Sequence, residues 1–307
     1  MKIRILSAFF LLAGICCYSQ NLPEVASGTF SRFENLRSNT ISSGHIDASL
    51  ADGYYKNKKY AVLYLYDAPM FFDSTTTSDR KEWRMNKNER RLIRENKTKD
   101  RIKVGIWNTE SRHINYFFLK AISNPSPDEK AEVHYLTIGP KKIRLLKNRP
   151  LSSRNRKSLV NELNPYSDST FSNFNIATRT IVADTSRGGL IPMYSTYENP
   201  RVLVGTTNLS THPPGTLNAE YNPVPELFLK HSRDNVAKPK NRKLFFDYGT
   251  ETLDPNYKPT QQQVDKIMKL KGYTPINWIN KEFPGAAPIE TVWNTRFYVS
   301  VKFLLGK

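Results

Sequence analysis

Ser186 stands at a position in this sequence where a serine could act as a nucleophile. It lies in the segment Ala-Asp-Thr-Ser-Arg-Gly-Gly, between the apolar run 179–182 and the helix-like run 190–194. When a strand passes through a sharp turn into a helix, the turn residue is lifted above the sheet edge and its hydroxyl is exposed. Such turns usually carry glycine two residues before and after the serine, and here Gly188 fills the later position while Asp184 occupies the earlier one. The segment predicts a nucleophile turn or, alternatively, a serine that caps a helix.

A catalytic serine also needs a base within hydrogen-bond reach and donors for the developing oxyanion. The sequence contains five histidines, and none of them follows His231. His212 comes after the apolar run that follows the serine, and ligands of open α/β sheets gather at the edge where such strands end. We therefore expect His212 to shape the pocket near Ser186 or to substitute for a missing base. The remaining histidines are interpreted as surface or loop residues: His45, His113, His134 and His231.

Several dispersed motifs, in this order, resemble one family of enzymes. They occupy residues 59–73, 104–108, 183–189, 209–215, 246–254 and 283–293. Together they are similar to the esterase family of α/β-hydrolases that contains esterase D-like and enterochelin-esterase-like enzymes. The resemblance runs from about Phe30 to Leu305. It implies an α/β-hydrolase fold and hydrolysis of a small-molecule or glycan ester, with Ser186 as the nucleophile.

The resemblance also implies roles for other residues. Asp254 matches the catalytic acid and has Glu251 as a neighbour, although an aspartate before Pro255 is equally typical of a turn. The backbone amide of Arg187 would be the first oxyanion donor. The second donor is expected in the turn after residues 60–66. Because Pro69 has no N–H group, the amide of Ala68 or Met70 would have to serve there.

This chain departs from the family at the positions of its catalytic residues. The family sequence Phe-Pro-Gly-Ala-Ala-His-Ser-Glu aligns without a gap on residues 283–290, and Pro288 stands at the position of the catalytic histidine. Removing only the histidine of such a triad lowers kcat about a millionfold in a well-studied protease. The family also carries His-Asp-Gly-Gln where this chain has Tyr66 to Pro69, and glycine in place of Asp184. A carboxylate at position 184 would oppose the negative charge that develops at the serine.

Apolar runs alternate with helical patterns along the chain, which is typical of a mostly parallel central sheet with helices on both faces. This pattern predicts an α/β fold. The predicted strands are 60–66, 102–107, 178–183, 202–208, 243–248 and 276–283. The predicted helices are 153–166, 189–197, 225–232 and 260–270.

The N-terminal residues 1–19 are typical of a signal peptide. Lys2 and Arg4 precede an apolar core, and small residues stand at the positions that a signal peptidase recognises. We expect an exported protein, periplasmic or secreted, with a single domain at 20–307. The apolar core is too short to span a membrane, and a lipid anchor on Cys16 or Cys17 is the less favoured alternative. Both cysteines lie in this segment, so the mature chain would contain no disulfide.

The net charge of +18 includes Lys2 and Arg4. Residues 141–157 carry eight basic residues and no acidic one, and residues 80–103 carry eleven basic against four acidic residues. Such a surface could bind anionic polymers or lipids, but no nucleic-acid-binding motif accompanies it and we expect no nucleic acid partner. The favoured interpretation is a solvated basic surface. The spacing of histidine and acidic residues matches no metal site, and no glycine-rich phosphate loop occurs, so we expect no cofactor and no metal.

Taken together, the sequence predicts an exported esterase-like α/β-hydrolase whose activity is weak or lost. The alternative is a non-catalytic descendant that binds a glycan, a siderophore-like ester or a polyanion in the pocket where the esterase ancestor bound its substrate.

Overall fold

The computed structural model describes residues 28–72, 91–108, 112–116, 126–128, 133, 135–138, 143–144, 152–174, 180–186, 188–213 and 222–306. Its centre is an eight-stranded sheet with the order β1-β2-β4-β3-β7-β8-β9-β10. The strands are β1 (Phe30–Leu36), β2 (Gly44–Ser49), β3 (Ala61–Tyr66), β4 (Arg101–Ile106), β7 (Thr180–Thr185), β8 (Gly205–Leu209), β9 (Lys243–Gly249) and β10 (Trp278–Phe283). A separate small hairpin joins β5 (Thr137–Ile138) to β6 (Ile143–Arg144).

The sheet is parallel from β4 to β10, whereas β1 and β2 extend it as an antiparallel edge. The predicted mostly parallel α/β architecture is therefore confirmed. Buried parallel strands need apolar side chains on both faces, and every residue of β3 and β7 is buried. The carboxyl ends of β3, β4, β7, β8 and β9 consequently meet at one edge, where the connecting turns can assemble a site.

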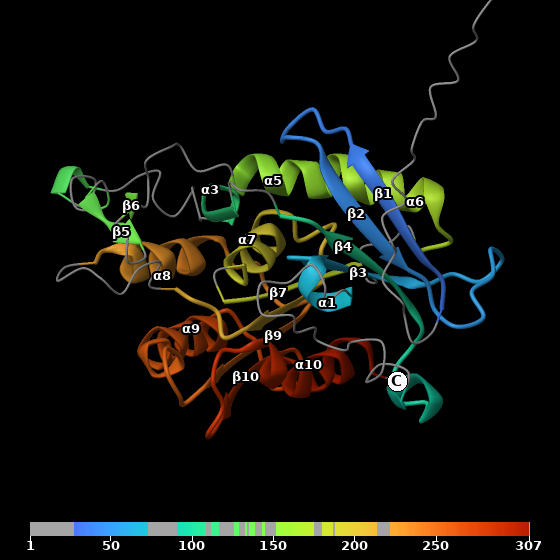
Figure 1. Cartoon of the computed structure of the whole chain (residues 1–307). Helices are drawn as coiled ribbons and strands as arrows, with labels where there is room; N and C mark the ends of the chain where they lie inside the picture. The colour runs from blue at the N-terminus through green and yellow to red at the C-terminus, as the bar shows by residue number, and fades with distance from the viewer. Residues whose placement is uncertain are drawn as a thin grey trace, which may run out of the picture.

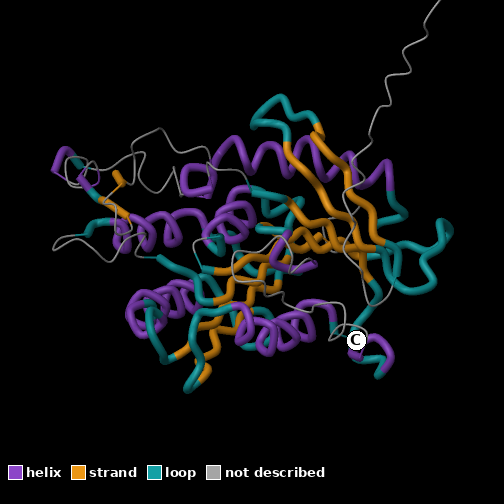
Figure 2. The backbone as a smooth tube through the Cα atoms, viewed as in Figure 1, coloured by secondary structure: helices purple, strands orange, loops and turns teal. Residues whose placement is uncertain are grey.

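Helices cover both faces of the sheet (Figures 1 and 2). The helices are α1 (Pro69–Phe72), α3 (Arg112–Tyr116), α5 (Ser152–Ser158), η2 (Leu159–Leu163), α6 (Asn164–Thr170), α7 (Leu190–Glu198), α8 (Val224–Asn235), η4 (Asp254–Asn256), α9 (Lys258–Leu270) and α10 (Glu290–Leu305). Side chains of η2, α7, α8 and α9 pack on one face, in clusters that contain Tyr64, Val182 and Phe246. On the opposite face, α1 and α10 pack against Leu63 and Phe245.

The helix α10, drawn in red in Figure 1, is absent from our sequence-based prediction. Its C-terminal half alternates valine and aromatic residues, a composition that favours strands. Buried Trp293, Phe297, Val301 and Leu305 nevertheless recur every four residues and pack on the core. Tertiary packing of this stripe therefore decides the conformation, and it also brings Arg296 into the interior.

The predicted helix at 153–166 is one continuous helical segment from α5 through η2 to α6. Its middle, η2, is a π-helix in which the amide of Asn164 donates to the carbonyl of Leu159. Pro165, the next residue, has no amide hydrogen to continue the α-helical ladder, so the backbone widens before it. The segment keeps Leu159 and Leu163 in the core while Glu162 points toward the connection between β1 and β2.

Candidate functional site

Ser186 occupies the sharp turn between β7 and α7. Its backbone φ is +52°, a left-handed value that non-glycine residues rarely adopt, as predicted for a nucleophile turn. The turn is held by two backbone hydrogen bonds: the Ser186 amide donates to the Leu209 carbonyl at 2.8 Å, and the His212 amide donates to the Ser186 carbonyl at 3.1 Å. The N-cap of α7 is Gly189, which forms no side-chain cap, so the interpretation of Ser186 as a helix cap is wrong.

Asp184 lies on β7 directly beneath this turn. A Cβ atom added to Gly188 would lie 2.0 Å from Asp184 Oδ2, so the carboxyl fills the space where a side chain at 188 would stand. Asp184 is buried, and its Oδ1 accepts a hydrogen bond from the Thr185 amide at 2.7 Å. Burial and then the negative charge of Asp67 raise the pKa of the Asp184 carboxyl well above its ordinary value. Glycine at 188 is therefore required by the aspartate at 184.

Asp67, whose negative charge acts on Asp184, follows directly after β3. Its carboxylate accepts hydrogen bonds from the guanidinium of Arg112, the amide nitrogen of Asn108 and the hydroxyl of Tyr116. The Arg112 Nε–Oδ2 distance is 2.9 Å and the Tyr116 hydroxyl–Oδ1 distance is 2.9 Å. Arg112 also acts to lower the pKa of Asp184, so its positive charge interacts favourably with the carboxyls of both Asp67 and Asp184. Our sequence analysis did not single out Arg112, because no motif marks it.

Asp254 is fully buried, at 0% exposure, and belongs to a second polar cluster on the opposite face of the sheet. Its Oδ2 accepts hydrogen bonds from the Ser210 hydroxyl, at 2.8 Å, and from the Gly249 amide. The guanidinium of Arg296 donates to Ser210 Oγ at 2.7 Å and lies 3.7 Å from Asp254 Oδ2. Arg296 is only 2% exposed. The predicted catalytic acid is thus engaged by a serine, a backbone amide and an arginine.

Asp247 is a further buried carboxyl beside the same guanidinium. Its Oδ1 lies 3.6 Å from Arg296 Nη1 and accepts a hydrogen bond from the Ser210 amide at 2.9 Å. Burial raises the pKa of Asp247 to about 7, against the opposing charge of Arg296. Burial likewise raises the pKa of Asp254, although the hydrogen bond from Ser210 acts to lower it. One buried arginine therefore faces two carboxyls whose charged forms are both destabilised by burial.

The loop that carries Pro288 lies against the loop that carries Asp254. The carbonyl of Ala286 accepts hydrogen bonds from the amides of Thr250, at 3.0 Å, and Glu251, at 3.1 Å. The Gly285 amide also donates to the Thr250 hydroxyl at 2.8 Å. These bonds hold the loop of Pro288, the position predicted from the resemblance to have lost a histidine, beside the loop of Asp254. Proline has no group that could accept the proton of a serine hydroxyl.

His212 follows β8 at the same sheet edge as Ser186, as predicted. Its Nδ1 is 2.9 Å from the hydroxyl of Tyr257, and the two rings meet edge to face at 5.1 Å. Two of the other histidines differ from our prediction of surface or loop positions. His231 is buried in α8 beside the ring of Tyr194, and His45 is half-buried in β2, where its ring meets that of Trp107 edge to face. The side chain of His113 and all of His134 lie outside the described residues.

The candidate oxyanion donors fall partly within the described structure. The Ala68 amide donates to the Ile106 carbonyl at 3.1 Å, so it is not directed at a substrate. Met70 is the second residue of α1 and follows Pro69, which leaves its backbone amide as the other candidate on this side. Arg187 lies outside the described residues, and so do the predicted signal segment 1–19 and much of both basic segments. No group of three or more histidine, cysteine or acidic side chains suited to a metal occurs among the described residues.

The sheet order and the turn at Ser186 after β7 are those of an α/β-hydrolase fold. A CE1 ferulic acid esterase from Anaeromyces mucronatus is similar over 93% of this chain and 92% of its own, with 16% identity and a TM-score of 0.58. An IroE-like serine hydrolase from Shewanella oneidensis is similar over 90% of this chain and 79% of its own, with 17% identity and a TM-score of 0.63. The enterobactin esterase of Shigella flexneri is similar over 92% of this chain and 61% of its own, with 12% identity and a TM-score of 0.60.

At these identities the likeness is one of fold, and it confirms the predicted fold class and the resemblance to esterase-type hydrolases. No protein-family model matches the chain, and no curated protein matches it. Within the part of the chain that the structure describes, no helix is both long enough and apolar enough to cross a membrane.

Proposed function

We propose that this protein is a descendant of serine esterases in which acyl transfer through Ser186 is weak or lost. The reaction would begin with attack of the Ser186 hydroxyl oxygen on an ester carbonyl carbon, while a base takes the hydroxyl proton. An acid would orient that base and stabilise its charged form. The positive φ of Ser186 supports the role of the serine, because this geometry exposes the hydroxyl at the turn.

The observation that carries the proposal is the state of Asp254. Arg296, Ser210 and the Gly249 amide all engage its Oδ2 atom. An acid of a working triad would instead accept a hydrogen bond from an imidazole. The adjacent loop offers Pro288 where that imidazole would stand, and the ring of His212 is bonded to the Tyr257 hydroxyl. The nucleophile turn is retained while its proton acceptor is replaced.

The central experiment restores the base. Hydrolysis of a short-chain aryl ester is compared for the wild type, Pro288→His, and Pro288→His combined with Ser186→Ala. We expect little serine-dependent turnover in the wild type and a gain of at least about tenfold in Pro288→His that the added serine substitution removes. The gain should stay far below that of a native triad, because Arg296 competes for Asp254 and Asp184 lies beneath the turn.

Pro275→His is the matched control, because an exposed imidazole hydrolyses aryl esters slowly by itself. Pro275 precedes β10, at the sheet edge opposite Ser186, so an imidazole there adds the same chemistry without access to the turn. Fast serine-dependent turnover by the wild type would refute the proposal. Equal rates for Pro288→His and Pro275→His would show that the missing base is not what limits the protein.

The second candidate is non-catalytic binding of a small-molecule or glycan ester in the same pocket. The contacts of Asp254 favour it, since a carboxyl held by Arg296, Ser210 and the Gly249 amide is not paired with an imidazole as triad chemistry requires. Retention of an ester ligand by Ser186→Ala with unchanged affinity, together with no turnover in any variant, would support binding over catalysis. Release of the ligand as hydrolysed product would contradict it.

We also propose export, on the basis of the charged start and apolar core of residues 1–19. Expression of the full chain in a bacterial host, followed by intact mass measurement of the periplasmic fraction, tests this. A product that begins at Gln20 is expected, whereas a full-length cytosolic product would contradict export.

A further inference from the structure

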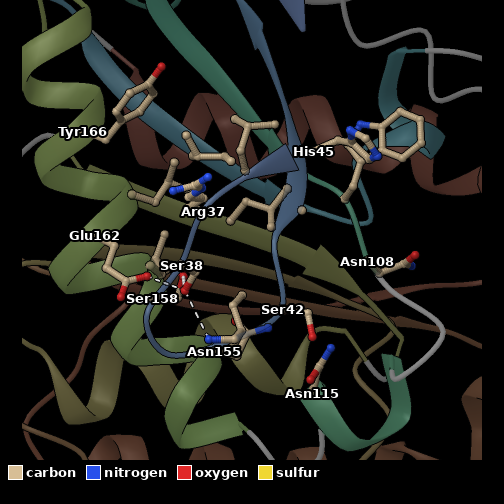
Figure 3. Close-up of a pocket in the computed structure, with 18 of the residues that line it drawn as sticks. Arg37, Ser38, Ser42, His45, Asn108, Asn115, Asn155, Ser158, Glu162 and Tyr166 are labelled. Carbon is tan, nitrogen blue, oxygen red and sulfur yellow. Dashed lines mark hydrogen bonds between the residues drawn. The ribbon is translucent and has the colours of Figure 1, made fainter. Parts of the chain in front are cut away.

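Figure 3 shows the residues that line a cavity of about 230 Å³. The connection between β1 and β2 forms one wall, the end of β4 a second, and the segment from α5 through η2 to α6 a third. Ser186, Asp254, His212 and Pro288 do not line it. Asn108 and Tyr116, which donate hydrogen bonds to Asp67, also line it, so the cavity adjoins the Asp67 cluster and does not contain the serine turn.

The cavity has an apolar interior. Ile46 and Ile106 from the sheet face Leu159 and Leu163 from η2 across it. An apolar cavity of about 150 Å³ is known to stay dry and to bind benzene, so 230 Å³ accommodates one ring with a short substituent. Pockets of this composition, with a few polar groups at defined points, are typical small-molecule sites. The π-helical turn η2 contributes to the wall, and such turns occur frequently at functional sites.

Glu162 is the one acidic residue among the described residues that line the cavity, and its carboxylate is already hydrogen-bonded to the protein. Its carboxylate accepts hydrogen bonds from the Ser38 hydroxyl, from the Asn39 amide at 3.1 Å and from the Thr40 hydroxyl at 3.3 Å. Burial acts to raise the pKa of Glu162, but these bonds outweigh it and the pKa lies below its ordinary value. Glu162 thus anchors the connection that covers the cavity, and it does not present a free charge to a ligand.

Arg37 carries the opposite charge and also lines the cavity. It is exposed, so its guanidinium lies at the mouth, and Figure 3 shows it beside the side chains of the interior. Among the described residues, no carboxylate forms a salt bridge with Arg37. A guanidinium at the mouth of an apolar cavity matches a ligand that joins a compact hydrocarbon body to one carboxylate.

We propose that this cavity binds a small monocarboxylate with a compact hydrocarbon body, such as a single saturated ring. The ring occupies the space between Ile106 and Leu163, and the carboxylate pairs with Arg37 at the mouth. Binding at this site requires no reaction at Ser186.

Titration calorimetry at pH 7 with three ligands of one shape tests the charge preference. Cyclohexanecarboxylate is the anion, cyclohexylmethanol the neutral match and cyclohexylmethylamine the cation. Because a hydrogen bond to a charged group strengthens binding more than a neutral one, we expect the carboxylate to bind at least about tenfold more tightly than the alcohol. The amine should bind more weakly than the alcohol. Equal affinity for all three ligands would overturn the proposal.

Gly44→Leu tests the position. Gly44 lines the cavity and shares a strand face with Ile46, and a Cβ atom added there meets nothing within 4 Å. The leucine should fill the cavity without disturbing the fold, which circular dichroism and a thermal unfolding curve would verify. Binding of cyclohexanecarboxylate should then be lost. Unchanged binding by the folded variant would mean that the ligand sits elsewhere, including at the serine turn.

Arg37→Gln tests the charge, with Arg154→Gln as its control. Arg154 is an exposed residue of α5 that does not line the cavity, so both variants lose one positive charge. We expect Arg37→Gln to weaken carboxylate binding about tenfold and to leave alcohol binding unchanged, whereas Arg154→Gln changes neither. Similar losses in both variants, or no binding by the wild type at about 10 mM ligand, would refute the site. None of these binding measurements depends on esterase activity. A failure of this proposal can therefore be distinguished from a failure of the proposed function.

Discussion

The guanidinium of Arg296 lies 3.7 Å from the carboxylate of Asp254, and both side chains are buried. This relationship connects α10, the last helix of the chain, with the loop that follows β9. The same guanidinium lies 3.6 Å from Asp247, so one arginine compensates two buried carboxyls. A guanidinium does not give up its proton in proteins, so this positive charge beside the two carboxyls is permanent.

Replacement of Arg296 by alanine should destabilise the protein strongly. Removing one partner of a buried ion pair leaves an uncompensated charge and typically costs about 3–5 kcal/mol. Urea unfolding at pH 7.5 measures the change in the free energy of unfolding. Arg233→Ala is the control, because Arg233 and Glu226 form an exposed pair at 3.7 Å, and pairs of this kind contribute less than about 1 kcal/mol. Similar losses in the two variants would argue against a structural role for the buried pair.

Asp247 should make the protein less stable as the pH rises. Its pKa in the folded state is about 7, above the ordinary value of 3.8, so the folded state binds this proton more tightly than the unfolded state. Its favourable contribution is complete below the ordinary value and is lost as the pH rises through about 7. Asp247→Asn should therefore lose less stability between about pH 5 and pH 8 than the wild type.

Denaturant unfolding at several pH values measures this difference. Asp234→Asn, which replaces an exposed residue of α8, should follow the wild-type pH dependence. If Asp247→Asn also follows the wild type, the carboxyl at 247 is not the group that links stability to pH.

Gly188 and Asp184 should be energetically coupled. In Gly188→Ala the new methyl group would lie 2.0 Å from Asp184 Oδ2, which no side chain tolerates, and we expect a loss of about 1–3 kcal/mol. In the background of Asp184→Ala the methyl group has room, so the second substitution should cost much less. A double-mutant cycle measured by urea unfolding gives the coupling energy. Additive effects would show that the carboxyl does not occupy the space beneath the turn.

Glu162→Gln should loosen the connection between β1 and β2. The substitution removes the charge that receives the hydrogen bonds of Ser38, Asn39 and Thr40. Each hydrogen bond to a charged group contributes about 1.5–3 kcal/mol at most, so the expected loss of stability is about 1–3 kcal/mol. Hydrogen exchange should become faster at residues 38–41. The exposed Glu226→Gln is the control, and equal protection of 38–41 in both variants would contradict the anchoring role.

Much of the fold was predictable because buried parallel strands must be apolar on both faces. The runs at 60–66, 102–107 and 243–248 mark β3, β4 and β9 to within two residues. The edge strands β1 and β2 were not predicted, since each is polar along part of its length and pairs only with neighbours distant in sequence.

The sequence by itself determined the parallel core, the strained turn at Ser186 and the absence of a histidine at 288, because each depends on residue type or local spacing. Only the tertiary structure decided which groups contact the buried carboxyls. Arg296 reaches Asp254 because α10 packs across β8 and β9. Arg112 reaches Asp67 because Tyr116 of α3 packs on Tyr66 at the end of β3. Neither arginine belongs to a motif, and each is separated from its carboxylate partner by more than forty residues in the sequence. Partners of this kind are selected by the packing of whole elements, which local sequence patterns do not encode.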